Sequence, residues 1–103
     1  MGELLSFPHP QNYALAMKRI RQLWEDGKVE LVSHAIKQMA KRHIDMLDIQ
    51  HVIRYGRIVD HSMPLYLWRY KVAGTRVNGR PVACIVEIDG NLIIVTVIAT
   101  RRR

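Results

Sequence analysis

The chain has 103 residues, 49% of them hydrophobic and 24% charged, a size and composition typical of one globular domain and not of a disordered chain. No apolar run approaches the roughly 20 residues that a membrane-spanning helix needs. Sixteen Lys and Arg against nine Asp and Glu give a formal net charge of +7, which favours nucleic acid or an acidic protein as partner.

The sequence favours a cytoplasmic protein. The N-terminal stretch lacks a basic segment and contains Glu3, so it does not have the pattern of a secretory signal peptide. Cys84 is the single cysteine, which excludes an internal disulfide and a zinc site built from cysteines. Its place in an apolar segment predicts a small buried side chain.

The first predicted helix begins at Pro10, a residue suited to the first helical position, and ends at Gly27. Its apolar residues recur with helical spacing and form one stripe: Tyr13, Met17, Ile20 and Trp24. A brief extended segment, 29–32, follows.

The second predicted helix spans Ser33 to His43, with Ser33 as the N-cap. Its apolar side is expected to consist of Ile36, Met39, Ala40 and either His43 or Ile44.

The third predicted helix spans Met46 to Tyr55 and has clear end signals. Asp45 is the expected N-cap, Asp48 adds negative charge in the first turn, and Gly56 ends the helix. Its apolar stripe is Met46, Ile49, Val52 and Ile53.

After Gly56 the pattern changes to that of strands, predicted at 57–60, 66–77, 81–88 and 92–100. Asn78-Gly79 and Asp89-Gly90 predict two hairpins with type I′ turns. Tyr66, Trp68 and Tyr70 alternate on one expected face; they are either core residues or a surface that stacks on unpaired bases.

These elements predict an α+β domain, with N-terminal helices packed on a three- to four-stranded antiparallel sheet. The whole chain, 1–103, is expected to form a single domain. Within it, 1–27 is an N-terminal helical extension, 28–100 the core and 101–103 a basic tail.

The sequence offers no motif for a metal, nucleotide or dinucleotide site, and no serine-hydrolase motif. We therefore expect no metal and no cofactor. Three segments carry cations without acids: 32–44, 61–86 and 101–103. They serve either general solubility or RNA phosphates, and the candidate phosphate-binding residues are Lys37, Lys41, Arg69, Lys71, Arg76 and Arg101.

A histidine among cations suits RNA cleavage without metal. The 2′-hydroxyl of the RNA attacks the adjacent phosphate, a histidine moves the proton, and arginine stabilises the charge that builds up.

Several short motifs resemble a bacterial family known only as a domain of unknown function. They are Ser33-His34-Ala35 with Met39, Arg42 and Ile44, then Asp48-Ile49, Gly56-Arg57-Ile58, Gly79-Arg80-Pro81-Val82 and Ile94-Val95-Thr96-Val97. This family is grouped with the RelE/BrnT-like toxins, and its genes often lie beside MqsA-type zinc-finger antitoxins. The resemblance covers 29–97 and implies a RelE-like fold, two helices against an antiparallel sheet.

The resemblance implies four catalytic residues, His34, Arg42, Arg80 and Thr96. From the sequence we expect His34 on one side of a phosphate-binding cleft and Arg80 and Thr96 on the other. Each residue also has a structural alternative. His34 would pack or cap the helix, and Arg42 would form an ion pair with Asp45 or Asp48. Arg80 would be a surface arginine, and Thr96 an ordinary strand residue.

The chain departs from the family pattern at three positions. His43 stands where the family usually has glycine, and Ala83 and Ile98 stand where histidine and tyrosine are often found. The expected function is that of a toxin of a toxin–antitoxin system, a metal-independent ribonuclease neutralised by an acidic segment of its antitoxin. The alternative is a non-catalytic module on the same fold that binds RNA or protein.

Overall fold

A computed structural model of the chain describes residues 12–99. Along the chain it contains α1 (Tyr13–Glu25), β1 (Val29–Leu31), α2 (Ser33–Arg42), α3 (Met46–Tyr55), β2 (Arg57–Ser62), β3 (Arg69–Thr75), β4 (Pro81–Asp89) and β5 (Asn91–Ile98). The fold is α+β, as predicted. The expected helix start at Pro10 and the basic tail 101–103 lie outside the described residues.

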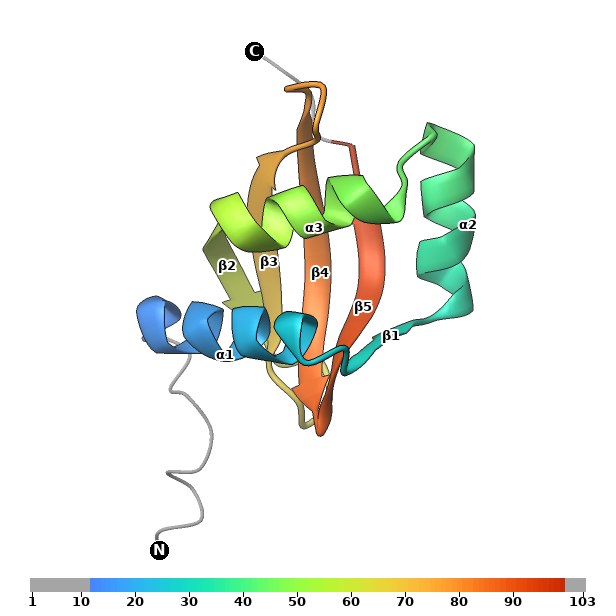
Figure 1. Cartoon of the computed structure of the whole chain (residues 1–103). Helices are drawn as coiled ribbons and strands as arrows, with labels where there is room; N and C mark the ends of the chain where they lie inside the picture. The colour runs from blue at the N-terminus through green and yellow to red at the C-terminus, as the bar shows by residue number, and fades with distance from the viewer. Residues whose placement is uncertain (1–11, 100–103) are drawn as a thin grey trace, which may run out of the picture.

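The strands form one five-stranded sheet in the order β1-β5-β4-β3-β2 (Figure 1). Strands β2 to β5 form the predicted antiparallel meander. The expectation of a purely antiparallel sheet of three or four strands was wrong, because β1 pairs in parallel with β5, with Leu31 opposite Ile94. The predicted extended segment 29–32 is present as β1, and only the pairing shows that it joins the sheet beside β5.

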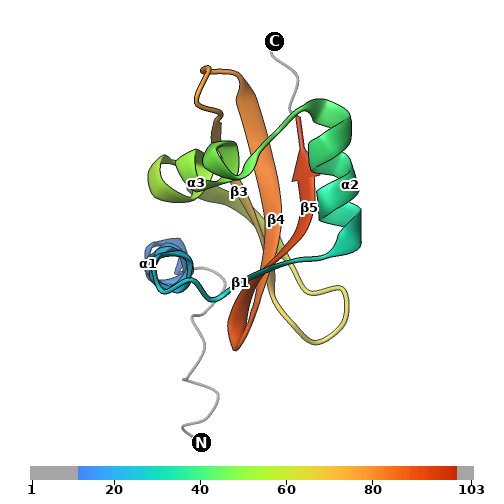
Figure 2. The same ribbon diagram turned by 45° about the vertical axis from the view of Figure 1, so that its right-hand side comes forward.

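One face of the sheet is covered by α1 and α3, whereas α2 lies beside β5 at the edge (Figures 1 and 2). The helices were expected to pack on the sheet, and α2 does so at its edge, where Ala35 and Met39 join the same core as the buried residues of α1 and α3. The chain leaves β1 at the edge of the sheet, where the Val32 N–H bonds to the Ile94 carbonyl, and α2 starts there. Its position follows from that anchor.

The position of α2 also changes which of its residues are buried. Ala35 and Met39, four residues apart, face the core, while Ile36 is 53% exposed and Ala40 and His43 are exposed too. The predicted stripe was therefore right at Met39 and at Ile44 and wrong at Ile36, Ala40 and His43. A helix at a sheet edge contacts the core along a narrow line and buries fewer residues.

The ends of α2 also differ from prediction. Val32 is the N-cap and has no side-chain hydrogen bond, so Ser33 is the first helical residue and not the cap. The helix ends at His43, which adopts the left-handed conformation with φ of 56°. This conformation favours glycine, the residue that the resemblance implies at this position.

Helix α3 forms as its sequence predicts. Asp45 and Asp48 make a capping box in which each carboxylate accepts the backbone N–H of the other residue. Ile49, Val52 and Ile53 are buried, but Met46 is 44% exposed because it lies in the first turn, at the end of the sheet.

Two glycines bring α3 close to β3. A Cβ atom at Gly56 would lie 2.5 Å from the carbonyl oxygens of Ala73 and Val52, and one at Gly74 would lie 3.1 Å from the Cα of Gly56. Arg21 of α1 completes this junction by donating to the carbonyls of Ile53 and Gly56. The end of α3 is thus fixed between α1 and β3.

Helix α1 contributes four buried residues to the core, Ala16, Met17, Ile20 and Leu23, with Tyr13 and Trp24 partly buried beside them. The predicted stripe was therefore broadly right. Among the described residues no helix is long and apolar enough to cross a membrane.

Both predicted hairpins are present, but their turns are not type I′. Gly79 and Gly90 have positive φ, whereas Asn78 and Asp89 do not, and a type I′ turn needs both central residues there. Strand β3 begins at Arg69, so Tyr66 lies in the preceding loop and not on the predicted strand face.

Candidate functional site

The sheet face opposite α1 and α3 carries no helix among the described residues (Figure 2). We call it the uncovered face. Cross-strand pairing arranges its side chains in rows, and the central row runs across four strands from Asp60 through Lys71 and Ile85 to Thr96. Directly paired side chains have Cβ atoms about 5 Å apart. Residues from β2, β3, β4 and β5 are therefore immediate neighbours.

Two further rows flank the central one. The row toward the β2–β3 loop contains Ser62, Arg69, Glu87 and Ile93. The row on the other side contains Arg57, Ala73, Ala83 and Ile98. The uncovered face therefore changes from polar and charged in the row toward the β2–β3 loop to mainly apolar in the row on the other side, which we call the third row.

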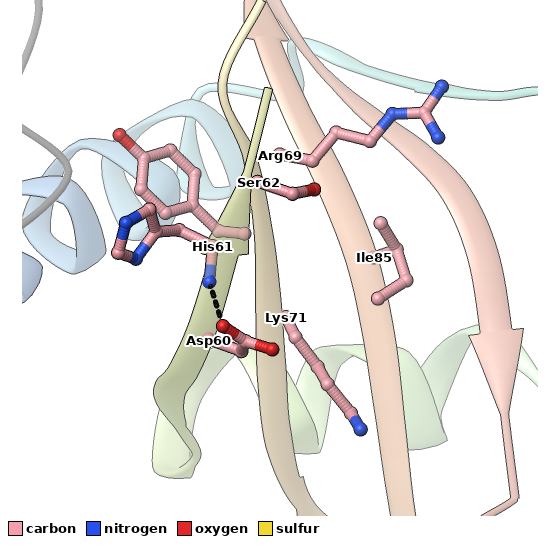
Figure 3. Close-up of a pocket in the computed structure, with 7 residues that line it drawn as sticks. Asp60, His61, Ser62, Arg69, Lys71 and Ile85 are labelled. Atoms are coloured by element: carbon pink, nitrogen blue, oxygen red, sulfur yellow. Dashed lines mark hydrogen bonds between the residues drawn. The ribbon is translucent and has the colours of Figure 1, made fainter. Parts of the chain in front are cut away.

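A small pocket of about 90 Å³ lies on β2, β3 and β4 (Figure 3). Its lining includes Asp60, Ser62, Arg69, Lys71 and Ile85. Sites for whole cofactors are typically about 300–1,000 Å³, so this pocket suits a single group such as one phosphate. None of the four predicted catalytic residues lines it.

Lys71 is the cation at the pocket with no ion-pair partner within residues 12–99. The paired residue on β2, Asp60, accepts a hydrogen bond from the His61 N–H at 2.8 Å. Arg69, also predicted to bind phosphate, forms an ion pair with Glu87. Within residues 12–99 Lys71 is therefore the unpaired cation of this pocket, and Asp60 lies opposite it.

The structure divides the predicted site residues into three groups. The first lies on the uncovered face and contains Arg69, Lys71 and Thr96, the last of these half-buried in β5. Arg101 was also predicted to bind phosphate and lies outside the described residues.

The second group lies on α2 and contains His34, Lys37, Lys41 and Arg42, all of them exposed. His34 and Arg42 stand at opposite ends of the helix, about 12 Å apart along its axis at 1.5 Å per residue. The Arg42 Nε donates to Gln38 at 3.2 Å, and no ion pair with Asp45 or Asp48 is present in the described chain.

The third group is the β3–β4 hairpin, which carries Arg76 and Arg80. The Arg76 N–H bonds to the Arg80 carbonyl, so the two residues are adjacent in the turn. Asp48 fixes this hairpin to α3 by accepting the Val77 N–H at 3.1 Å. No hydrogen bond or ion pair within residues 12–99 joins Arg80 to His34 or Thr96, so the expected cleft between them stays a prediction.

Two departures from the family pattern meet on the uncovered face. Ala83 and Ile98 are directly paired across β4 and β5 in the third row. The histidine and tyrosine that the resemblance implies at these positions would therefore be direct neighbours. This chain has two apolar side chains there, and that end of the uncovered face lacks their polar groups.

Sequence reasoning missed Asp60, Ser62 and Ile85 as neighbours of Lys71. Asp60 and Ser62 alternate along β2, which is longer than the predicted 57–60. That alternation is a weak signal, and it does not show which residue of β3 stands opposite.

The strongest pKa shifts lie on the covered side of the sheet. Burial raises the pKa of the Cys84 thiol from 9.0 to about 12. Burial, and then the neighbouring Tyr13, raises the pKa of the Tyr70 phenol. The Tyr13 hydroxyl and His61 Nδ1 lie 2.6 Å apart on the same side. The Tyr13–His61 contact joins α1 to the sheet, and His61 and Tyr70 also line the small pocket. Within residues 12–99 no three His, Cys, Asp or Glu side chains cluster closely enough to hold a metal ion.

No curated protein and no solved structure matches this sequence. A family model described as a domain of unknown function, DUF4258, matches residues 31–99, which is more than half of the chain. The match begins at the last residue of β1 and includes every element from α2 to β5. The chain therefore belongs to this domain-of-unknown-function family.

Proposed function

We propose that the protein is a RelE/BrnT-like toxin that binds RNA through the uncovered face of its sheet. The observation that carries the proposal is the central row, which brings the cation of Lys71 and the hydroxyl of Thr96 to one open surface. Charge-assisted and hydroxyl contacts to phosphate are typical of RNA binding. Two helices and an antiparallel meander also agree with the RelE-like core that the resemblance implies.

The exposed cations of α2 support the same proposal. Lys37 and Lys41 are one turn apart at the sheet edge beside β5, and the segment 32–44 contains no acid. They add two exposed cations at the edge of the sheet. With a formal net charge of +7, the chain attracts a polyanion over a long range at low salt.

The test is RNA affinity as a function of salt concentration. The affinity should fall steeply with salt, since each neutralised phosphate releases counterions. Lys71→Ala should weaken binding by about tenfold, as expected for the loss of one charge-assisted contact. Arg19→Ala on α1 is the matched control for charge and should have a much smaller effect.

Asp60→Asn provides a control of opposite sign. The amide keeps an oxygen that can accept the His61 N–H, but it removes the negative charge opposite Lys71. RNA should therefore bind this variant more tightly than the unchanged protein. Equal affinity in all four proteins would mean that the charge serves only solubility.

Metal-independent RNA cleavage is the second candidate function. Thr96, one of the four predicted catalytic residues, lies in the same row as Lys71, about 10 Å away across Ile85, so an extended RNA can meet both residues. In this reading His34 moves the proton of the attacking 2′-hydroxyl, and the products end in a 2′,3′-cyclic phosphate.

Cleavage by the purified protein in excess chelator tests this second candidate. His34→Ala should reduce the rate by about 10² or more, as expected for the loss of a general acid or base, while leaving RNA affinity unchanged. Arg80→Ala should reduce both. If the protein neither cuts RNA nor arrests growth when expressed alone, the non-catalytic binding module is the better reading. The pair Ala83–Ile98 favours that outcome.

An acidic segment of a cognate antitoxin is the protein partner that this proposal includes.

A further inference from the structure

The loop between β2 and β3 exposes an unusual amount of apolar surface. Met63 is 42% exposed, Leu65 78% and Tyr66 82%. The six residues 63–68 contain no charged side chain. Contiguous exposed apolar residues mark interaction sites more often than isolated ones do. The loop is therefore a candidate binding element that the four predicted catalytic residues do not include.

The loop adjoins the pocket on the uncovered face. It starts after Ser62 and ends before Arg69, and these two residues pair with each other and line the pocket beside Lys71. Figure 2 shows the loop bending away from α1 and α3, toward the uncovered face. An extended ligand whose charge lies on Lys71 thus reaches the loop within a few residues.

Of the three alternating aromatic residues Tyr66, Trp68 and Tyr70, only Tyr66 has a largely exposed ring. Tyr70 is 2% exposed in the core, and Trp68 is half-buried with its ring edge-on to His61 at a centroid distance of 5.7 Å. Tyr66, at 82%, has the largest exposed fraction of the large hydrophobic side chains in the described chain. Its ring therefore has a face available to a ligand.

We propose that the β2–β3 loop is a stacking platform for an unpaired RNA base, with Tyr66 as the stacking ring and Lys71 at a neighbouring phosphate. This inference rests on the proposed function and adds the class of RNA. The loop has no cation to bind a phosphate, whereas its exposed aromatic ring suits the flat face of a base. In a duplex both faces of each base are already stacked, so the platform selects single-stranded RNA.

A fluorescence titration tests the platform directly. The probe is a 12-nucleotide single-stranded RNA with 2-aminopurine at its centre, whose emission falls when the base stacks on a ring. The unchanged protein and Tyr66→Phe should quench the probe and bind it alike. Tyr66→Ala should bind about tenfold more weakly, as expected for the loss of one base–aromatic stack, and should not quench the probe.

Two other anions separate stacking from charge. The same RNA annealed to its complement, and inorganic polyphosphate, offer phosphates without free base faces. Tyr66→Ala should bind both as the unchanged protein does, whereas Lys71→Ala should lose affinity for all three probes. Because Tyr66 is exposed, the urea midpoint of Tyr66→Ala should equal that of the unchanged protein.

The outcomes of these experiments distinguish the stacking platform from the proposed RNA-binding surface. If Lys71→Ala weakens RNA binding but Tyr66→Ala does not, the RNA surface stands and the stacking platform is wrong. If the unchanged protein binds no RNA at low salt, both fail. If Tyr66→Ala leaves RNA binding intact but abolishes self-association in sedimentation, the loop is an interface between copies of the chain, and the platform is again wrong.

Discussion

The covered and uncovered faces of the sheet are built from alternate residues of the same strands. On the covered face Cys84, Val86 and Ile94 are fully buried beneath α1 and α3. On the uncovered face their strand neighbours Ile85 and Thr96 are only half-buried. The backbone of both faces is the same, so the difference comes from the helices. The covered face supplies the larger part of the core, and the uncovered face is more exposed to solvent.

Truncating one isoleucine on each face should give the largest contrast. Ile94→Ala leaves a cavity in the core and should cost about 2–5 kcal/mol of the free energy of unfolding. Ile85→Ala, on the half-buried uncovered face, should cost about 1 kcal/mol, within the usual range for a single substitution. Urea denaturation measures both. Equal losses would mean that further structure covers the second face as well.

Gly56→Ala tests how closely α3 packs on the covered face. Its Cβ would lie 2.5 Å from two carbonyl oxygens, so α3 must shift, at a cost of about 3 kcal/mol in unfolding free energy. Gly27→Ala is the control, since it meets no atom within 4 Å and is strained only by its φ of 74°. The control should lose about 1 kcal/mol. If the two variants have the same thermal midpoint, the close approach of α3 to β3 is wrong.

Cys84 gives the covered face a pH-dependent signature. Its thiol stays protonated in the folded chain up to a pKa of about 12, whereas the unfolded chain ionises it above 9.0. The unfolded state therefore binds fewer protons, and stability should fall as the pH rises from 9 toward 12, by about 1.4 kcal/mol per pH unit.

The control for this effect is Cys84→Ala, which removes the thiol. Denaturation at pH 8, 9.5 and 10.5 should show a steeper loss in the unchanged protein than in the variant. Parallel pH profiles would mean that the Cys84 thiol is accessible to water in the folded state.

The smallest expected effect lies outside both faces, at the turn between α2 and α3. His43→Gly should stabilise the protein by about 1 kcal/mol or less, because glycine adopts a φ of 56° without strain but gains more freedom in the unfolded chain. The urea midpoint should rise while RNA affinity stays unchanged. A lower midpoint would show that the exposed imidazole makes a contact that offsets the strain.

Local signals predicted the parts of the fold that depend on near neighbours in sequence. The capping box at Asp45 and Asp48 joins residues three apart, and α3 begins where it was predicted. Gly79 and Gly90 marked the two hairpins because they tolerate positive φ. The types of turn, by contrast, depend on how the flanking strands pair, and the sequence misassigned them.

The sequence by itself thus determined the element order, the antiparallel meander and the buried cysteine, through periodicity, capping and turn chemistry. Only the tertiary structure decided that β1 joins β5, that α2 lies at the edge with Ile36 exposed, and that Lys71 and Thr96 share a row. Strands β4 and β5 carry apolar residues on both sides, so their sequence does not show which side faces the helices. The row depends on register, which shifts at Val59 in β2 and at Val95 in β5, and such shifts arise from contacts between distant strands.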